Sequence, residues 1–322
     1  MDHFRRAMRA LGLRGGIVAT DITRSSPGFQ TADAGVIVPK ADAPEYVPAL
    51  LETVRRHGVR LAVPMTDLDL LPLARHRGEF EALGCTPMIG SEAIVSACMD
   101  KARTSALVRQ AGLAAIRTCT LEEFRREPFY PCFIKPVRGS AGIGAALIGS
   151  PAQLEMHVNA FGDRMLLQEY VPGQEFTIDV YRSRDGRVRC VVPRQRLVVR
   201  SGEVEKGLTV KDKGLMDAAA KLARNLEGLW GVFCCQCRRQ DGPHGDPRFF
   251  EVNPRFGGGA PLAIAAGADL VLYLLQEVTG KRITARLGRF RGGLLMLRYE
   301  QAVFVPVRDP QDLPGYRTPV FR

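Results

Sequence analysis

The sequence has 322 residues, of which 46% are hydrophobic and 25% are charged, a composition typical of a folded globular protein with material for about two domains. Its formal net charge of +11 favours anionic partners. The basic residues are spread along the chain without a run of five, and aromatic residues make up only 7%. We therefore expect a phosphorylated small molecule as the anionic partner, and no nucleic acid.

The cysteines and the apolar segments indicate a reducing, aqueous compartment. The eight cysteines lie mostly in apolar segments of a chain that is too large to need disulfides. The N-terminal segment MDHFRRAMRALG has an amphipathic helical pattern without the long apolar core of a secretory signal. The longest apolar stretch, residues 260–275, is interrupted by Gly267 and Asp269 and is too short to span a bilayer. We expect a cytoplasmic protein with no membrane partner.

Residues 1–95 alternate between helical and strand patterns. Helical patterns cover residues 1–11, 44–58 and 68–84, and strand patterns cover residues 16–22, 34–39, 59–67 and 86–90. This alternation predicts a parallel sheet with helices on its faces, as in a Rossmann-like domain. Such domains usually open with a strand, whereas this chain opens with a helix. We therefore expect a domain that lacks its first strand or whose true start lies upstream.

The character of the sequence changes after one long predicted helix over residues 91–113. Two strand patterns flank a glycine-rich loop at residues 131–149, followed by a helix at 151–162 and a strand at 165–171. Residues 175–199 predict a hairpin that turns at Asp185-Gly186. A helix at 211–228, a second strand pair at 231–254 and a helix at 259–280 follow. These changes divide the chain into segments 1–95, 96–185 and 186–322.

The glycine-rich loop KPVRGSAGIG, residues 135–144, is a candidate phosphate site. Its possible ligands are a lysine at a strand end, a serine and the backbone amides of three glycines, namely Lys135, Ser140, Gly139, Gly142 and Gly144. A tight hairpin turn with an incidental lysine explains the same residues about as well. Because the lysine precedes the glycines and the loop joins two strands, it is neither a Walker loop nor a dinucleotide fingerprint.

The stretch QEYVPGQEFTIDV, residues 168–180, supplies candidate nucleoside contacts. Glu169 ends an apolar strand, where a carboxylate or carbonyl can accept a hydrogen bond from an adenine amino group. Tyr170 follows in the same segment, and the backbone N–H of Val171 is a candidate donor to the ring. Glu175 is a candidate ligand for ribose hydroxyls. Solvated glutamates beside a turn are the alternative.

The stretch FFEVNPRFGGGAP, residues 249–261, is a candidate metal strand. Period-two spacing places Glu251, Asn253 and Arg255 on one strand face. Carboxylate and amide oxygens suit Mg²⁺, and an arginine suits a phosphate or an acyl phosphate. The preceding strand pattern offers Gln236, which an antiparallel pairing could bring beside Glu251. A salt-bridged strand end over a glycine-rich loop is the alternative, although three unsatisfied polar groups there would be costly.

Two arginines share one face of the strand pattern VVPRQRLVV, residues 191–199. One of Arg194 and Arg196 faces the anionic site in our interpretation, with exposure to solvent as the alternative. We favour Arg196 as the catalytic candidate, together with Lys135 and Arg255.

The cysteine pattern CCQC at residues 234–237 does not predict a zinc site. Alternate side chains of a strand lie on opposite faces, and no second cysteine pair with ligand spacing follows. The five histidines show neither metal-ligand nor triad spacing. Buried thiols are the simpler interpretation.

The order of these motifs resembles the ATP-grasp superfamily, and within it the carbamoyl-phosphate synthase large-subunit-like proteins. FEVNPRFGGGAP followed by AIAAGADL looks like the metal strand and next helix of that family. MDKART, residues 99–104, looks like the segment that leads into its ATP-binding domains, and IVATDI and PMTDLDLLPL look like its pre-ATP-grasp domain. The resemblance covers nearly the whole chain. It implies an α/β (α+β) fold with a pre-ATP-grasp domain at 1–95 and two ATP-grasp subdomains at 96–185 and 186–322.

The resemblance also implies roles for individual residues. On the nucleotide side it implies that Lys101 and Lys135 bind the ATP phosphates, which the loop of residues 139–144 covers. It implies that Glu169 and Val171 contact adenine and that Glu175 contacts the ribose. On the metal side it implies that Gln236, Glu251 and Asn253 are ligands for Mg²⁺ (or Mn²⁺). It implies that Arg255 faces an acyl phosphate.

The implied activity is an ATP-dependent ligation of a carboxylate to an amine or thiol through an acyl phosphate. Small-molecule carboxylates and amines would be its partners, and a homodimer is the default expectation for a soluble oligomer. Carbamoyl-phosphate synthesis is disfavoured because the large chain of that enzyme carries two such halves. An ATP-binding regulatory or assembly protein that has lost ligase chemistry is the alternative function.

Overall fold

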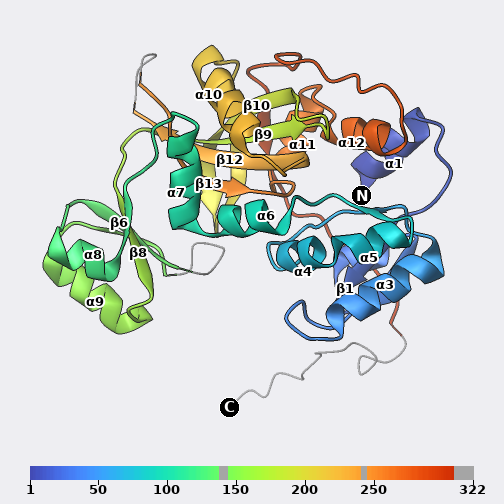
Figure 1. Cartoon of the computed structure of the whole chain (residues 1–322), viewed down its shortest axis with the longest axis horizontal. Coiled ribbons are helices and arrows are strands. Elements are labelled where there is room, and N and C mark those ends of the chain that lie inside the picture. Colours follow the sequence, from blue (N-terminus) through green and yellow to red (C-terminus); the bar gives the residue numbers. More distant parts are fainter. Residues whose placement is uncertain (138–143, 241–244, 308–322) are drawn as a thin grey trace. The chain divides into compact units, whose positions relative to one another are not determined.

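The computed structural model describes residues 1–137, 144–240 and 245–307 (Figure 1). The chain forms two compact units. One contains Met1–Ile89, Val271–Ile283 and the described residues from Tyr299 onward, and the other contains Gly90–Leu270 and Thr284–Arg298. No helix in the described ranges is long and apolar enough to cross a membrane.

The first unit confirms the predicted alternation of helices and short parallel strands. Strand β1 pairs in parallel with β2, and β3 with β4. The predicted helix over residues 68–84 is two helices, because the chain leaves helical geometry at His76. The elements are α1 (Asp2–Ala10), β1 (Val18–Asp21), α2 (Pro27–Thr31), β2 (Ala34–Ile37), α3 (Tyr46–His57), β3 (Leu61–Ala62), α4 (Leu70–Arg75), α5 (Arg77–Ala82), β4 (Thr86–Pro87) and nearly all of α12 (Leu270–Val278).

The second unit contains two antiparallel sheets. The smaller has the strand order β5-β8-β6-β7, and the larger has the order β13-β12-β9-β10-β11-β14. The helices of this unit are α6 (Glu92–Met99), α7 (Lys101–Gln110), α8 (Leu121–Arg126), α9 (Pro151–Phe161), α10 (Lys213–Asn225) and α11 (Ala260–Ala265). The strands are β5 (Thr118–Thr120), β6 (Cys132–Pro136), β7 (Ala146–Ile148), β8 (Met165–Glu169), β9 (Gln174–Arg182), β10 (Val188–Arg200), β11 (Glu203–Thr209), β12 (Gly231–Arg239), β13 (Arg248–Asn253) and β14 (Leu295–Leu297).

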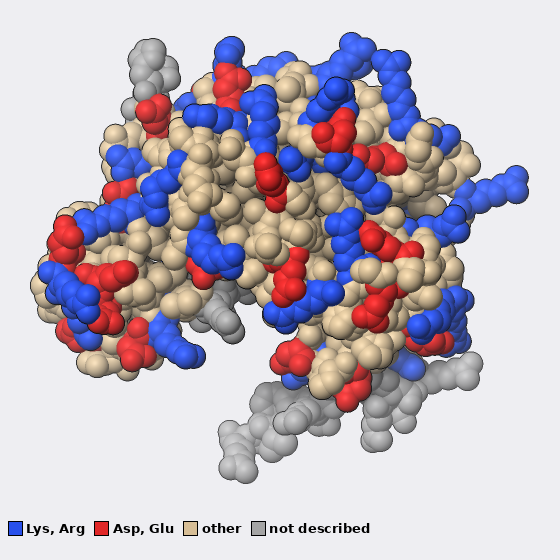
Figure 2. All heavy atoms as spheres, viewed as in Figure 1, with Lys and Arg blue, Asp and Glu red and all other residues tan. Residues whose placement is uncertain are grey.

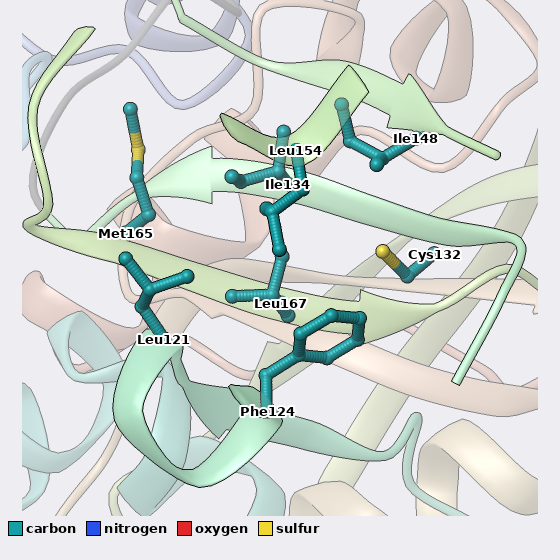
Figure 3. Packing of buried hydrophobic residues seen from close by; sticks show 8 residues of the cluster. All are labelled: Leu121, Phe124, Cys132, Ile134, Ile148, Leu154, Met165 and Leu167. Atoms are coloured by element: carbon teal, nitrogen blue, oxygen red, sulfur yellow. The ribbon is translucent and has the colours of Figure 1, made fainter. Parts of the chain in front are cut away.

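The smaller sheet is held by a compact apolar core (Figure 3). Its strands supply Cys132, Ile134, Ile148 and Leu167, and the helices α8 and α9 supply Phe124 and Leu154. Helix α8 is fixed at its start by a capping box in which Thr120 and Glu123 satisfy each other's backbone N–H groups. This core holds β6, and therefore its residue Lys135, in a fixed strand.

The larger sheet has one polar and one apolar face. Phe176 and Ile178 of β9 pair with Cys237 and Cys235 of β12 on the apolar face, and all four are buried. Helix α10 packs on β9 and β10, while α6 and α7 pack on β13 (Figure 1). The strict alternation of EFTIDV therefore produces a buried layer on one side of the sheet and leaves polar side chains on the other.

Two predicted helices are interrupted. Residues 91–113 form α6 and α7, because Asp100 takes extended geometry and its carboxylate accepts hydrogen bonds from the N–H groups of Ala102 and Arg103. Asp100 is therefore an N-cap that starts a new helix, with Lys101 as its first residue. Residues 259–280 likewise form α11 and α12, separated at Gly267, whose φ is +98°. The helical pattern of apolar residues alone does not predict either break, at Asp100 or at Gly267.

Candidate active site

The polar face of the larger sheet gathers side chains from four strands into rows. Register pairs Arg194 of β10 with Thr177 of β9, Thr177 with Gln236 of β12, and Gln236 with Glu251 of β13. Because directly paired residues project on the same side of a sheet, these four side chains form one row. The structure therefore brings Gln236 beside Glu251, as predicted from the antiparallel strand pair.

A second row lies two residues along the same strands. Asp179 of β9 pairs with Cys234, and Cys234 pairs with Asn253. The Nδ2 group of Asn253 donates a hydrogen bond to Oε1 of Glu251 over 2.8 Å. Glu251 and Asn253 thus share one face, which confirms the period-two prediction for these two residues.

A β-bulge in β13 sets which side chains face this site. Gln236 pairs with Glu251, but the next residue, Cys237, pairs with Phe249, so Phe250 is an extra residue. Phe249 is fully buried, and its backbone bonds to residues 114 and 116. Phe250 instead lies under the ammonium of Lys135, with 5.6 Å between Nζ and the ring centroid. The FFEVN pattern therefore divides its two aromatic rings between packing and the site.

Lys135, on β6 of the smaller sheet, is drawn into the same group of charges. The pKa of Lys135 is lowered to about 8, chiefly by burial and also by Lys101, while Glu251 and Glu175 act in the opposite direction. A buried lysine has lost the hydration of its ammonium group. A polyanionic ligand would stabilise the charged form of that ammonium. Lys101, Lys135, Glu175 and Glu251, predicted on separate segments, are thus close enough to affect one another.

Glu175 and Arg196 form an ion pair on the polar face. The Nε atom of Arg196 lies 2.8 Å from Oε1 of Glu175, and its Nη2 donates to the carbonyl of Gly202 over 2.9 Å. Arg196 is therefore paired and largely buried, and its side chain is 10% exposed. The predicted ribose ligand and the predicted catalytic arginine are neighbours in the structure, and their roles remain predictions.

The neighbouring arginine is completely buried in a second ion pair. Arg194 Nε donates to Asp179 Oδ2 over 2.5 Å, and Nη2 donates to Oδ1 over 3.0 Å. The two side chains are 1% and 0% exposed. Burial alone would lower the pKa of Arg194, but the charge and hydrogen bonds of Asp179 raise it, so the guanidinium stays charged.

The three glycines that follow the metal strand pack against this pair. A Cβ atom on Gly259 would lie 2.1 Å from Nη1 of Arg194, and one on Gly257 would lie 3.1 Å from Sγ of Cys234. A Cβ on Gly258 would lie 2.0 Å from Oε2 of Glu203. Gly259 is thus required for the close approach of this loop to Arg194.

Arg255 lies beyond the end of β13, so strand alternation does not place it. Its Nη1 donates to the carbonyl of Phe256 over 3.0 Å. Burial raises the pKa of Cys234 to about 12; Asp179 and Glu251 raise it too, and Arg194 and Arg255 lower it. Arg255 is therefore within electrostatic reach of Cys234 in the second row.

The predicted nucleoside contacts lie on and after β8. Glu169 forms an ion pair with Arg248, Tyr170 lies beneath Arg238 with 5.7 Å between the guanidinium carbon and the ring centroid, and Val171 is buried. The carboxylate of Glu169 is therefore already paired with a guanidinium group. These residues and Glu175 border the polar face, and their contacts with adenine or ribose remain predictions.

Much of the predicted glycine-rich loop lies outside the described residues, including Gly139, Ser140 and Gly142. Gly144 is described: its φ is +70°, and its carbonyl lies 2.9 Å from Nε2 of His157. The φ value requires a residue such as glycine at this position.

The cysteines are buried thiols, as predicted. All eight are free, and seven are buried. Burial raises the pKa of Cys98 and Cys190 to about 12, so these thiols are protonated and are poor nucleophiles. Within the described ranges, no group of three or more His, Cys, Asp or Glu side chains is arranged to hold a metal ion.

The residues present nevertheless fit Mg²⁺ bound together with a polyphosphate. Such a site needs few protein oxygens, because phosphates and water complete the coordination of the ion. Glu251, Asn253 and Gln236 offer neighbouring oxygen ligands, and the cations of Lys101 and Lys135 lie nearby. A carboxylate with two amides is also a donor set for a hard cation and not for zinc.

Sequence reasoning missed Asp179 and undervalued Arg194. The signal for Asp179 was present: Glu175, Thr177 and Asp179 alternate with Phe176 and Ile178 in the same way as Glu251 and Asn253 alternate with Val252. Which arginine would be buried could not be found in this pattern, because both share one face of β10. It depends on which of their side chains reaches Asp179.

Two protein families match the chain. The family described as "PylC-like, N-terminal domain" matches residues 1–89. The family described as "ATP-grasp in the biosynthetic pathway with Ter operon" matches residues 162–301. The second match includes both rows of the polar face.

Relatives with assigned activities share less than a third of aligned residues with this chain in the two matches described next. The chain is 25% identical over 206 residues to a D-alanine–D-alanine ligase of Bartonella bacilliformis, covering 58% of this chain and 60% of that protein. It is 29% identical over 197 residues to a formate-dependent phosphoribosylglycinamide formyltransferase of Synechococcus sp., covering 56% and 47%. The match thus spans less than two thirds of the length of either relative.

Solved structures share the fold. The biotin carboxylase domain of Hydrogenobacter thermophilus 2-oxoglutarate carboxylase, in complex with MgADP, superposes with a TM-score of 0.69 at 19% identity, covering 91% of this chain and 70% of that one. An L-amino acid ligase from Bacillus licheniformis superposes with a TM-score of 0.68 at 16% identity, covering 91% and 75%.

These proteins carry other names than carbamoyl-phosphate synthase, so that finer resemblance stays a prediction, as do the boundaries at residues 95 and 185. The wider assignment rests on two family matches, on relatives by sequence and on the observed architecture. Residues 162–301 therefore match an ATP-grasp family, and the chain has the ATP-grasp fold.

Proposed function

We propose that this protein is an ATP- and Mg²⁺-dependent ligase that joins a carboxylate to an amine, or to a thiol, through an acyl phosphate. The observation that carries the proposal is the row of Gln236 and Glu251 with Asn253 beside it, within electrostatic reach of Lys135. Oxygen ligands next to cations suit a metal–polyphosphate complex. The names of the D-alanine–D-alanine ligase and the L-amino acid ligase support a carbon–nitrogen ligation.

The proposed reaction has two steps. An oxygen of the substrate carboxylate bonds to the γ-phosphorus of ATP, and the bond from that phosphorus to the ADP oxygen breaks. The amine then attacks the acyl carbon, the bond from that carbon to the phosphate oxygen breaks, and the nitrogen loses a proton. Phosphate and ADP are released.

The chain's own residues would position the reactants and balance their charge. Lys135 and Lys101 would neutralise phosphate oxygens, and Arg255 would face the acyl phosphate. Bound Mg²⁺, or Mn²⁺ in its place, would neutralise further charge on the phosphates, held by Glu251, Asn253 and Gln236. No covalent nucleophile is needed, which agrees with the high pKa of the buried Cys234.

The first experiment measures ADP release by the purified protein with Mg·ATP across pools of amino acids and small carboxylic acids. We expect one pool to stimulate release and Glu251→Gln to reduce the stimulated kcat/KM by at least about a hundredfold, because the charge that holds the metal is lost. Glu205→Gln, on β11 of the same sheet, is the matched control and should retain activity.

The outcomes separate the candidate functions. Unchanged turnover in both Glu251→Gln and Glu251→Ala would contradict the metal assignment. Stabilisation by Mg·ATP without ADP release in any pool would favour the regulatory or assembly alternative. Absence of any shift in Tm with Mg·ATP would overturn the nucleotide site itself.

The proposal also includes partners and compartment. We expect small-molecule substrates and no nucleic acid, because Lys and Arg are interspersed with Asp and Glu on the face shown in Figure 2. A homodimer is kept as the oligomeric state to test; the 2-oxoglutarate carboxylase domain was described as a dimer. A reducing cytoplasm suits eight free cysteines.

A further inference from the structure

Arg194 carries an unused pair of donors inside the site. A guanidinium has five N–H donors, and Asp179 accepts from Nε and Nη2. The Nη1 atom is buried and has no hydrogen-bond partner among the described residues. Leaving a charged donor buried without an acceptor is costly, so the arrangement is understandable if the acceptor belongs to a ligand.

The position of Nη1 shows where that ligand would lie. Nη1 points at the loop of residues 257–259, where only the absence of a Cβ on Gly259 allows its approach. The loop consists of glycine alone, so it places no side chain of its own against Nη1. Arg194 shares its row with Gln236 and Glu251.

The electrostatic neighbours of Arg194 differ from those of Lys135. The pKa of Lys135 responds to Lys101 and Glu175 on the predicted nucleotide side and to Glu251 of the predicted metal site. The charges that act on Arg194 are instead Asp179, Cys234 and Glu203. In the row, Arg194 is three strands from Glu251, or roughly 14 Å between backbones. An anion on Nη1 would therefore lie at the Arg194 end of this row, away from Lys135.

We infer that Arg194 Nη1 binds an anionic oxygen of the substrate that is not the nucleotide, either its carboxylate or the acyl phosphate formed from it. The inference rests on the proposed function and adds a ligand for the second substrate. Asp179 has a positioning role, because its two bonds fix the guanidinium and leave Nη1 directed at the loop. Arg255, which also acts on Cys234, approaches the same place from the end of β13.

The test compares wild-type protein with Arg194→Lys, which keeps a positive charge for Asp179 but loses the forked donors. Arg200→Lys makes the same chemical change at an exposed position of the same strand and is the matched control. Inorganic phosphate serves as the probe of the acyl-phosphate position and is titrated calorimetrically with and without Mg·ADP. The KM of the stimulating carboxylate is measured separately by ADP release.

We expect Arg194→Lys to weaken phosphate binding and to raise the KM of the carboxylate by about tenfold to a hundredfold, the size expected for a lost hydrogen bond to a charged group. The Kd of Mg·ATP should change less than about threefold, because the nucleotide side is separate. An effect on the carboxylate KM alone would assign Nη1 to the substrate carboxylate, and an effect on both would assign it to the acyl phosphate.

Other outcomes overturn the inference. Unchanged phosphate binding and an unchanged carboxylate KM in Arg194→Lys would show that the arginine has only a structural role. Failure of wild-type protein to bind phosphate in either condition, together with an unchanged carboxylate KM in Arg194→Lys, would show that no such anion site exists. Failure to bind Mg·ATP would instead contradict the proposed function, and phosphate titration without nucleotide would still test Arg194.

Misfolding is distinguished by a second variant. Arg194→Met combined with Asp179→Leu replaces the buried ion pair by apolar groups, a change that folded proteins often tolerate. This double variant should retain the Tm shift with Mg·ATP and lose phosphate binding. Phosphate binding and a carboxylate KM that both match those of the wild-type protein would, in the folded double variant, overturn the inference.

Discussion

Single side chains in this site carry charges whose state depends on their neighbours. Lys135 shows this most clearly, because burial lowers its pKa from 10.5 to about 8. The free protein thus begins to lose this positive charge just above neutral pH. In the unfolded chain the lysine keeps its proton to higher pH, so this residue makes the free protein more stable as the pH rises from about 8 towards 10.5.

Ligand binding should show the opposite dependence on pH. Phosphate oxygens favour the charged lysine, so above pH 8 the protein must take up a proton to bind Mg·ATP. We expect the affinity for Mg·ATP to fall by up to about tenfold between pH 8 and pH 9. Calorimetric titration at pH 7, 8 and 9 measures this change.

Two variants test whether Lys135 causes the dependence. Lys135→Arg keeps its charge at all these pH values, so its affinity should lose the fall above pH 8, whatever its value at pH 7. Lys206→Arg, at an exposed position on β11, should keep the wild-type profile. An affinity of the wild-type protein that is constant from pH 7 to pH 9 would contradict the assignment of Lys135 to the phosphates.

At the scale of elements, the site depends on how closely a loop and a strand approach each other. Residues 257–259 pass over the pair of Arg194 and Asp179, and two of the glycines differ in what they meet. A side chain on Gly259 would meet the rigid Nη1 of Arg194 at 2.1 Å and Cγ1 of Val204 at 2.7 Å. A side chain on Gly258 would meet only the carboxylate of Glu203, which is 62% exposed and can rotate away.

We therefore expect Gly259→Ala to lower the free energy of unfolding by about 1–3 kcal/mol, as overpacking does. Gly258→Ala should cost less than about 0.5 kcal/mol, as surface changes do. Gly214→Ala in α10, whose Cβ would meet nothing closer than 3.4 Å, is the control. Urea unfolding measures all three, and equal effects of the Gly258 and Gly259 variants would show that Arg194 does not constrain the loop.

At the scale of the whole molecule, the candidate site residues lie in only one of the two compact units. The nucleotide and metal candidates described above all belong to the unit that contains residues 90–270. The only tryptophan of the sequence, Trp230, is in this unit. It is 6% exposed, with the guanidinium carbon of Arg184 4.1 Å from its ring centroid. Its fluorescence therefore reports on one unit alone.

We expect unfolding followed by Trp230 fluorescence and by far-ultraviolet circular dichroism to give different midpoints in urea, because multidomain proteins often depart from two-state behaviour. Mg·ATP should raise the fluorescence midpoint and move the dichroism curve only in part, since the ligand stabilises the unit that binds it. Coincident curves with and without ligand would show that both units unfold together. Trp230→Phe removes the signal and serves as the optical control.

The sequence by itself determined most of the elements, the ATP-grasp fold and many of the residues that the structure brings together. Period-two alternation placed Glu251 and Asn253 on one face, because the pleat of a strand is a local property of the backbone. The hairpins at Asp185-Gly186 and at the metal strand were also predictable, since their strands are adjacent in sequence. Helix breaks at Asp100 and Gly267 were not predicted, because a cap depends on the geometry of one residue and not on hydrophobic periodicity.

Only the tertiary structure decided which charges meet. The pairing of Asp179 with Arg194, the bulge at Phe250 and the approach of Lys135 to Glu251 all depend on strand register or on contact between two sheets. Register and contact are fixed by packing across the whole unit, so no local pattern contains them. For the same reason the sequence could not show that Arg194 is the fully buried arginine of β10, and the catalytic role of Arg196 stays a prediction.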